Sequence, residues 1–251
     1  MEGQAMVIEV HNVAKRYSKK CKQGVLQDIS LQIERQTCLA LLGESGTGKS
    51  TLGRIMVGLE PINKGDILFN GEKLLAGRHK HFAGKIQMAF QDPLSAFNPR
   101  ITIGESLAEP LFVEKAGNSE RTERINGLCN DVQLDLELLH RFPNQLSGGQ
   151  LQRAAIARAL MSRPSFVVLD EVVSSLDVIH QHHILELLNT LKKTYGLSYL
   201  FITHDFLAAN YVADRIAVLH DGAIIDHAEK KANGKWKFVH PQAVRLQEAA
   251  L

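Results

Sequence analysis

Alternation of apolar and polar residues marks two stretches near the beginning of the chain, 6–13 and 29–33. In a strand, successive side chains point to opposite faces, so both stretches are predicted to be half-buried strands. Further strands are predicted at 38–42, 67–69, 86–90, 166–169, 198–203, 215–219 and 223–225. Two turns punctuate this pattern, Asn70-Gly71 and Asp221-Gly222, both typical of tight connections between strands.

Helical spacing of apolar residues appears between these strands. Leu52, Ile55, Met56 and Leu59 form one stripe, which stops at Pro61, and Ile184, Leu187, Leu188 and Leu191 form another, with Gly196 just beyond it. Strands that alternate with helices predict an α/β fold with a mostly parallel, doubly wound sheet and a ligand site at the carboxyl ends of its strands.

The stretch 94–160 differs, because it shows helical patterns and polar loops but no convincing strand. We therefore predict one domain with an inserted helical subdomain at 94–160, while 1–93 and 161–251 form the α/β core with an antiparallel β arm. Within the insertion, 114–124 is polar and is expected to be exposed between helices.

Composition excludes several classes. With 251 residues, 45% of them hydrophobic, and a formal net charge of +2, the chain is typical of a globular protein without a nucleic-acid footprint. Cys21, Cys38 and Cys129 form no C-x-x-C pair, which argues against a zinc site or disulfide framework and favours a reducing cytosol. No apolar run approaches the ~18 residues that span a bilayer, so work at a membrane would require a partner.

One motif carries chemistry by itself. Residues 43–51 read GESGTGKST, directly after the apolar run 38–42 and before a helical pattern. Glycines at 43, 46 and 48 are expected to adopt positive φ and to turn backbone N–H groups toward an anion. Lys49 supplies a charge to the β- and γ-phosphates of a nucleotide, and the Ser50 hydroxyl suits Mg²⁺. A chance glycine-rich turn is the alternative, and the full match favours a nucleoside triphosphate.

Polar residues follow three of the predicted strands. Gln91, Asp170 and His204 each lie just past a strand end, where the ligand site of such a sheet is expected. By local sequence alone, the pair Asp170-Glu171 could be two exposed carboxylates, and His204 a capping or core histidine. Tyr17 is either a surface tyrosine or a platform for a purine ring, and its local sequence favours the surface.

Taken with the phosphate loop, four further motifs give the chain a strong resemblance to the ATP-binding subunits of ABC transporters. These motifs are Leu146-Ser147-Gly148-Gly149-Gln150, Val167-Val168-Leu169-Asp170-Glu171, Ser174-Ser175-Leu176-Asp177 and Thr203-His204-Asp205. They follow the order of the family and extend the resemblance over nearly the whole chain, which implies ATP and Mg²⁺ as ligands.

The resemblance implies a role for each matched residue. The phosphates are held by the loop residues Gly43, Glu44, Ser45, Gly46, Thr47, Gly48, Lys49, Ser50 and Thr51, and Lys49 also supports catalysis. Tyr17 stacks on adenine, which reverses the preference from local sequence, and Mg²⁺ is faced by Ser50, Gln91 and Asp170. Glu171 orients and deprotonates the attacking water, while Gln91 and His204 sense the γ-phosphate. Gln91 also links to the transmembrane partner.

A second anion site is predicted where Ser147, Gly148, Gly149 and Gln150 open a helix, since a helix N-terminus presents free N–H groups. In the resembled family this site faces the γ-phosphate bound to another subunit, and Asp177 lies along that interface. The resemblance thus implies a dimer with ATP between the subunits, and a related but different partner chain is favoured over a homodimer. Transmembrane permease subunits, and indirectly a solute-binding protein, complete the expected assembly.

Residues 91–100, with 103–105 and 109–111, resemble the dipeptide, oligopeptide and nickel importer branch. Short length, the absence of cysteine after Cys129 and Val172 in place of a usual proline favour nickel or metal-chelate import over peptide import. Val172 is also expected to change how the loop after Glu171 is held, and so to affect the hydrolysis rate rather than nucleotide binding. The resemblance places the protein peripherally on the cytoplasmic face of the cell membrane.

Two other classes compete: a soluble ABC ATPase acting on DNA or ribosomes, and a nucleotide-binding module that regulates without turnover. The chain shows neither a long coiled coil nor a second cassette.

Histidines at 180, 182 and 183 invite a metal site, as do His79 and His81. No carboxylate or cysteine completes either set, so solvated faces are favoured.

Overall fold

The computed structural model describes residues 5–17, 24–74, 82, 84–231 and 233–249. Cys21, His79 and His81 therefore lie outside the described residues. The strands are β1 Met6–Lys15, β2 Leu26–Glu34, β3 Cys38–Leu42, β4 Lys64–Phe69, β5 Glu72–Lys73, β6 Ile86–Ala89, β7 Phe166–Asp170, β8 Ser198–Thr203, β9 Arg215–His220 and β10 Ala223–Glu229. The α-helices are α1 Lys49–Met56, α2 Ile103–Val113, α3 Asn118–Asp131, α4 Gly148–Leu160, α5 Val178–Tyr195, α6 Phe206–Val212 and α7 Pro241–Glu248.

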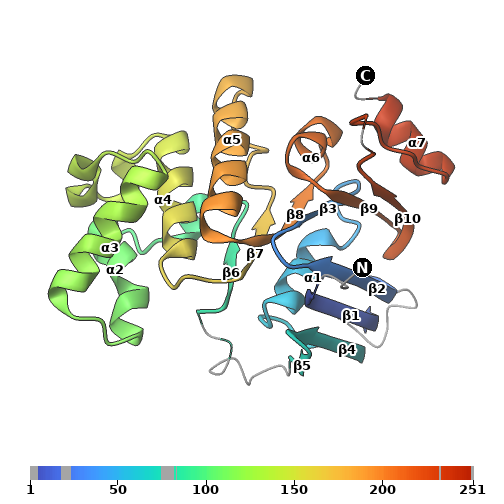
Figure 1. Ribbon diagram of the computed structural model, residues 1–251, viewed down its shortest axis with the longest axis horizontal. Coiled ribbons are helices and arrows are strands. Elements are labelled where there is room, and N and C mark those ends of the chain that lie inside the picture. The colour runs from blue at the N-terminus through green and yellow to red at the C-terminus, as the bar shows by residue number, and fades with distance from the viewer. Residues whose placement is uncertain (1–4, 18–23, 75–81, 83, 232, 250–251) are drawn as a thin grey trace.

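The central sheet has the order β10-β9-β3-β8-β7-β6, and all neighbouring strands are parallel except β10, which pairs antiparallel with β9 (Figure 1). Its register aligns the strand ends, because Leu42 pairs with Thr203 and Asp170 pairs with Ile202. The residues that follow β3, β7 and β8 consequently emerge at one edge of the sheet. The predicted fold class is confirmed.

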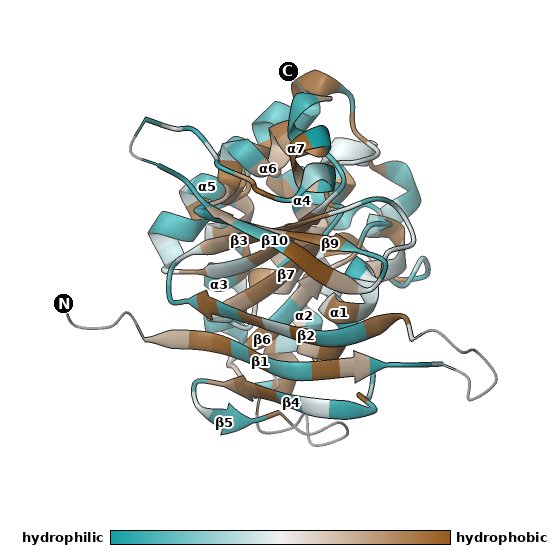
Figure 2. Ribbon diagram, turned by 90° about the vertical axis from the view of Figure 1, so that its right-hand side faces the viewer, coloured by the Kyte–Doolittle hydropathy of each residue, from teal (hydrophilic) through white to brown (hydrophobic). Residues whose placement is uncertain are grey.

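A second sheet, β2-β1-β4-β5, is antiparallel and corresponds to the predicted β arm. Figure 2 shows it on the side of the central sheet opposite helices α5, α6 and α7. The buried residues of β1 and β2 pack with the apolar face of α1, among them Leu52 and Ile55, and with Leu41 and Ile202 of the central sheet. Helix α1 thus lies between the two sheets, next to the edge of the central sheet where the phosphate loop lies.

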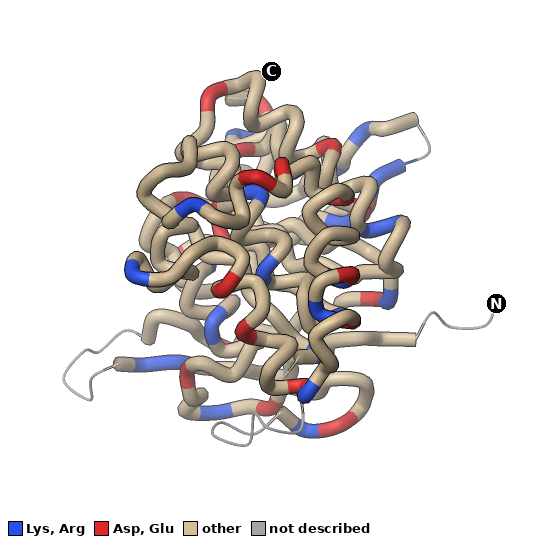
Figure 3. The backbone as a smooth tube through the Cα atoms, turned by 90° about the vertical axis from the view of Figure 1, so that its left-hand side faces the viewer, with Lys and Arg blue, Asp and Glu red and all other residues tan. Residues whose placement is uncertain are grey.

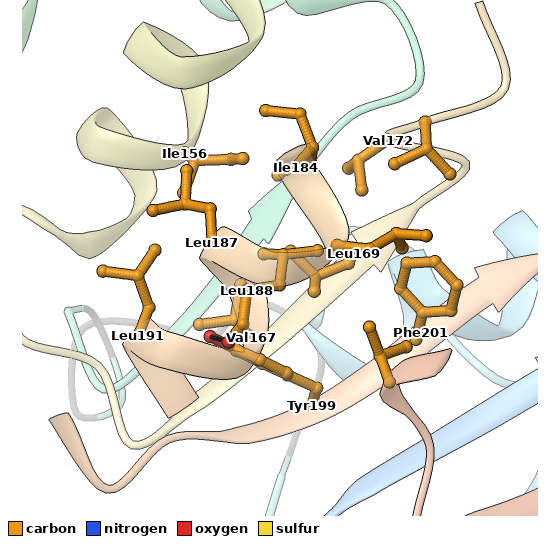
Figure 4. Packing of buried hydrophobic residues seen from close by; sticks show 14 of the residues in the cluster. Ile156, Val167, Leu169, Val172, Ile184, Leu187, Leu188, Leu191, Tyr199 and Phe201 are labelled. Atoms are coloured by element: carbon orange, nitrogen blue, oxygen red, sulfur yellow. Dashed lines mark hydrogen bonds between the residues drawn. The ribbon is translucent and has the colours of Figure 1, made fainter. Parts of the chain in front are cut away.

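The other face of the central sheet is covered by α4, α5 and α6. The predicted apolar stripe of α5 is buried against Val167, Leu169 and Tyr199, and the Tyr199 hydroxyl donates to the carbonyl of Leu188 at 3.3 Å (Figure 4). Gly196 ends α5 with φ 62°, the left-handed conformation that glycine adopts at low cost.

Between β6 and β7 the described chain is helical, as predicted, and it packs at one end of the sheet (Figure 1). Thr102 caps α2 through a reciprocal pair of bonds with Glu105. Buried residues of α2, α3 and α4 belong to the same apolar cluster as the central sheet. The limits 94 and 160 of a separate subdomain stay a prediction.

The expectation that 114–124 connects two helices is wrong in part. Residues 114–117 do so, but 118–124 form the first half of α3, although most of them are exposed as predicted. Ile125, Leu128 and Cys129 anchor the second half of the helix in the core. That apolar face, located beyond the polar stretch, extends the helix backward through residues whose own sequence is typical of a loop.

Within the described residues, no helix combines the length and the apolar character that crossing a membrane requires. Figure 3 shows acidic and basic residues interspersed over one face of the molecule, in keeping with the small net charge.

Candidate functional site

The phosphate loop connects β3 to α1, and its glycines act in two ways. Gly46 and Gly48 have φ angles of 84° and 105°, as predicted. Gly43 does not adopt positive φ, so that prediction is wrong; instead, an added Cβ there would lie 2.3 Å from the carbonyl oxygen of Leu219. Gly43 is therefore required for close approach of the loop to β9. Glu44, Ser45 and Gly46 are exposed, and the Thr47 hydroxyl donates to the carbonyl of Glu44.

Lys49 is buried at the start of α1. Its Nζ donates to the carbonyls of Gly43 and Glu44, both at 2.8 Å, and lies 3.9 Å from Glu171 Oε1. Desolvation lowers the pKa of Lys49, and the nearby carboxylates Glu171 and Asp170 oppose this effect. An anion at the loop would give the ammonium the full charge partner that these carbonyls only partly replace.

Asp170 closes β7 and is 2% exposed. Its Oδ1 accepts a hydrogen bond from the Ser50 hydroxyl at 2.8 Å, so a carboxylate and a hydroxyl share one side of the loop. Burial raises the pKa of Asp170, although Ser50 lowers it in part. A cation at this position would relieve the cost of keeping the carboxylate charged.

Glu171 brings three other predicted site residues together. Its Oε2 accepts from Gln91 Nε2 at 3.1 Å, while its Oε1 lies 3.6 Å from His204 Nδ1 and 3.9 Å from Lys49 Nζ. Glu171 is 9% exposed, whereas the His204 side chain is half exposed. A carboxylate so placed can accept a proton at the rim of a phosphate site.

The backbone of Glu171 is itself constrained. Its φ of 48° is uncommon for a residue with a side chain, and it is fixed by N–H donation to the Ile202 carbonyl and by Ser174, whose N–H and hydroxyl both donate to the Glu171 carbonyl. Val172 and Val173 are both buried in the apolar core, and Figure 4 shows Val172 there. Packing of Val172 thus holds the loop after Glu171 without the proline that is expected of peptide-type subunits.

A pocket of about 290 Å³ lies over the phosphate loop. Its lining combines the loop with residues that the strand ends supply: Val25, Ser45, Gly46, Gly48, Lys49, Ser50, Thr51, Gln91 and Glu171. Val25 was missed by sequence reasoning, because an apolar residue directly before a strand carries no signal for nucleotide binding. The pocket combines amide donors, an ammonium, hydroxyls and a carboxylate, the groups that phosphate chemistry requires.

The segment Ser147–Gln150 does not line this pocket. Ser147 caps α4: its hydroxyl accepts from Gln150 N–H at 3.3 Å, and its own N–H donates to Gln150 Oε1. Ser147 and Gly148 are exposed. Helix α4 therefore begins at the surface, and its N-terminus takes no part in lining the pocket over the phosphate loop.

Tyr17 reaches α1 through its hydroxyl, which donates to Glu60 Oε2 at 2.6 Å and lies 3.3 Å from Thr51 Oγ1. The residue is 60% exposed. Sequence reasoning missed Glu60, because 43 residues separate it from Tyr17 and its position after α1 resembles an ordinary polar turn.

The histidines of α5 have other contacts. His180 Nδ1 lies 2.7 Å from Asp177 Oδ2, and the His182 ring meets Tyr211 edge to face. Among the described residues, no three histidine, cysteine, aspartate or glutamate side chains are grouped as metal ligands. Asp177 caps α5 by accepting from the His180 N–H.

Comparison with known proteins supplies the identity. Residues 26–174 match the family model described as ABC transporter. The chain belongs to the ABC transporter family. The match covers the phosphate loop, the α4 N-terminus and the Asp170-Glu171 pair, so the geometry above is that of an ABC cassette ATPase.

Named relatives place this ABC cassette among the ATP-binding subunits of importers. It is 39% identical to the nickel import ATP-binding protein NikE of Pseudomonas putida over 98% of this chain and 93% of that one. It is 41% identical to the oligopeptide transport ATP-binding protein OppF of Bacillus subtilis over 81% of this chain and 68% of that one. A Brucella abortus protein named for peptide import is matched over 63% of its length.

Solved structures agree with the fold. The cassette superposes with a TM-score of 0.81 and 28% identity on the dimeric, post-hydrolysis ATP-binding cassette MJ0796 bound to ADP and Pi, covering 90% of this chain and 99% of that one. The cbiO1 protein of Clostridium perfringens, part of the transporter complex cbiONQ, gives a TM-score of 0.81 at 26% identity.

Proposed function

We propose that this cassette hydrolyses ATP to power uptake of nickel or a metal chelate through membrane permease subunits, working as a dimer that encloses ATP between two cassettes. The observation that carries the dimer is the separation of its two anion sites. The pocket over the phosphate loop is lined without Ser147, Gly148 or Gly149, and the exposed α4 N-terminus offers free N–H groups elsewhere. A second cassette supplies the missing wall, and the dimeric MJ0796 structure supports this arrangement.

Mg²⁺ fits the donor set beside the loop. Ser50, Gln91 and Asp170 can each offer a hard oxygen donor, and burial raises the pKa of Asp170, a cost of charging this carboxylate that a bound cation would offset. We propose that these three side chains hold the ion, which when bound neutralises charge on the β- and γ-phosphates.

Glu171 is proposed as the general base for the attacking water. Its contacts support this role, since Gln91 fixes one carboxylate oxygen, and His204 and Lys49 flank the other. Gln91 and His204 lie on either side of Glu171, where a γ-phosphate would contact both; loss of that phosphate would change the hydrogen bonding of both residues.

Tyr17 is proposed as the platform for the adenine ring.

Replacement of Asp170 by asparagine is expected to stabilise the nucleotide-free protein while abolishing Mg²⁺-dependent hydrolysis. The folded-state pKa of Asp170 is raised above its unfolded value, so ionisation disfavours folding as the pH rises through the folded pKa, and at pH 7 this penalty is present. Asparagine keeps an acceptor for Ser50 without the charge. Thermal unfolding midpoints at pH 7 and ATPase rates with Mg²⁺ measure the two effects, and a lower midpoint would refute the buried-charge argument.

The cargo is proposed from the relatives. NikE of Pseudomonas putida matches 98% of this chain, whereas OppF of Bacillus subtilis matches 81% of it, which favours nickel or a nickel chelate over an oligopeptide. We place the protein on the cytoplasmic face of the cell membrane, with permease subunits as partners and a solute-binding protein acting indirectly. The partner cassette is proposed to be a related, different chain.

Affinity purification of the tagged cassette from its native membranes tests this assignment. We expect co-purification of integral membrane subunits, and uptake of ⁶³Ni, rather than of a labelled oligopeptide, that depends on Glu171. Recovery of the cassette with nucleic acid or ribosomes, and without membrane subunits, would favour a soluble ABC ATPase instead.

A further inference from the structure

The hydroxyl of Tyr17 is held from the far end of α1. Glu60 lies beyond the C-terminus of α1, yet its Oε2 accepts a hydrogen bond from the Tyr17 hydroxyl, with 2.6 Å between the two oxygens. The same hydroxyl lies 3.3 Å from Thr51 Oγ1, at the phosphate end of the helix. A hydrogen bond from a phenol to a carboxylate is stronger than one between neutral groups. The ring edge of Tyr17 is consequently fixed at a set distance from the phosphate loop.

Glu60 is fixed in turn by two cations. Lys15 Nζ lies 3.5 Å from Glu60 Oε2, and Arg54 Nη1 lies 3.9 Å from Oε1. The side chains of Lys15 and Glu60 are 8% and 19% exposed, and Lys15 also donates to the carbonyl of Pro61 at 2.7 Å. Because the carboxylate is paired and largely buried, it is a rigid acceptor for Tyr17.

Lys15 also touches the aromatic ring itself. Its Nζ lies 4.9 Å from the centroid of the Tyr17 ring, within the range of a cation–π contact. Tyr17 nonetheless remains 60% exposed. The ring is thus anchored by its hydroxyl and by a cation, while much of its apolar surface stays open to a stacking partner.

We propose that Glu60 is a positioning residue for nucleotide binding: it holds Tyr17 in the orientation that stacks on the base while the phosphate loop holds the phosphates. The inference deepens the proposed function and depends on it, since it requires Tyr17 to meet the base. Thr51 belongs both to this hydrogen-bonded group and to the lining of the phosphate pocket. Glu60, Tyr17 and Thr51 therefore set the base platform and the phosphate site in one frame, and preorganisation of this kind raises affinity by reducing the ordering that binding demands.

The test compares two ligands that share phosphates but differ in the base. Dissociation constants for ATP and for inorganic tripolyphosphate are measured by calorimetry, with Mg²⁺, on the full chain. Glu60→Ala is expected to raise the Kd for ATP about fivefold to tenfold, within the range that base–aromatic stacking provides. The Kd for tripolyphosphate is expected to stay unchanged, because it has no base to stack.

Three further variants separate positioning from folding. Glu60→Gln keeps an acceptor for the phenol and should restore most of the ATP affinity. Tyr17→Phe keeps the ring but removes the donor, so it should match Glu60→Ala, and the double variant should be no weaker than either single one. Glu123→Ala replaces an exposed glutamate on α3 and serves as the matched control.

The outcomes are distinct. If Glu60→Ala weakens both ligands equally, leaves ATP binding unchanged or tightens it, or adds fully to Tyr17→Phe, Glu60 is no positioning residue. If Tyr17→Ala leaves the Kd for ATP unchanged, the proposed base platform itself fails, whatever Glu60 does.

Discussion

Replacing Lys49 by alanine is expected to abolish ATP hydrolysis and to weaken ATP binding about tenfold to a hundredfold, as loss of a hydrogen bond to a charged group does. In the free protein the ammonium is held by two loop carbonyls and lies 3.9 Å from Glu171. A triphosphate would offer it a stronger partner than either carbonyl. Calorimetric titration with ATP and release of phosphate over time measure both effects.

The Lys49→Ala protein should remain folded. Desolvation lowers the pKa of Lys49, which means that folding opposes its charge, so removal of the ammonium is not expected to reduce the thermal midpoint. Lys193→Ala, at an exposed position in α5, is the control for loss of a positive charge. ATP affinity equal to that of the unmodified protein after Lys49→Ala would show that the loop does not bind the phosphates as argued.

Replacing Glu171 by glutamine is expected to slow hydrolysis about a hundredfold to ten-thousandfold, the range that general-base catalysis supplies, while ATP binding persists. Glutamine preserves the side-chain shape and an acceptor for Gln91, but it cannot take a proton. Single-turnover measurements with bound ATP isolate this step from binding and product release.

Gln91→Ala is the comparison for the Glu171→Gln variant. Gln91→Ala removes the bond that fixes Glu171 Oε2 and should slow hydrolysis less, because the carboxylate itself remains. Normal turnover by Glu171→Gln would show that Glu171 is not the general base. Another group would then have to take the proton, and His204 is the nearest candidate.

Local patterns predicted most of the architecture because the elements concerned are locally determined. Strand β3 is apolar throughout, α5 carries one apolar stripe and a terminal glycine, and the turn at 70–71 has positive φ at both positions. Local patterns failed at 118–124, where the helix depends on apolar residues further along the chain.

The candidate site divides in the same way. Convergence of the residues after β3, β7 and β8 follows from a parallel sheet, so the proximity of Lys49, Glu171 and His204 could be anticipated. The requirement for glycine at 43 could not, since its neighbour Leu219 lies 176 positions away in sequence and only the register of β3 against β9 brings them together. The contact of Glu60 with Tyr17 could not be predicted either, since the two residues are 43 positions apart in sequence.

The central claim is that two cassettes complete each other's nucleotide pockets, and sedimentation velocity of the Glu171→Gln protein tests it most directly. Gly148→Asp is the matched control, because an added Cβ at Gly148 meets no described atom within 4 Å, while a carboxylate there would repel a partner's phosphate. The account predicts that ATP, but not ADP, pairs the 27.8 kDa chain with a second copy or with a related cassette, which doubles the sedimenting mass. It also predicts that Gly148→Asp prevents this pairing. No increase in mass with ATP and any companion cassette, or equal pairing by Gly148→Asp, would contradict it.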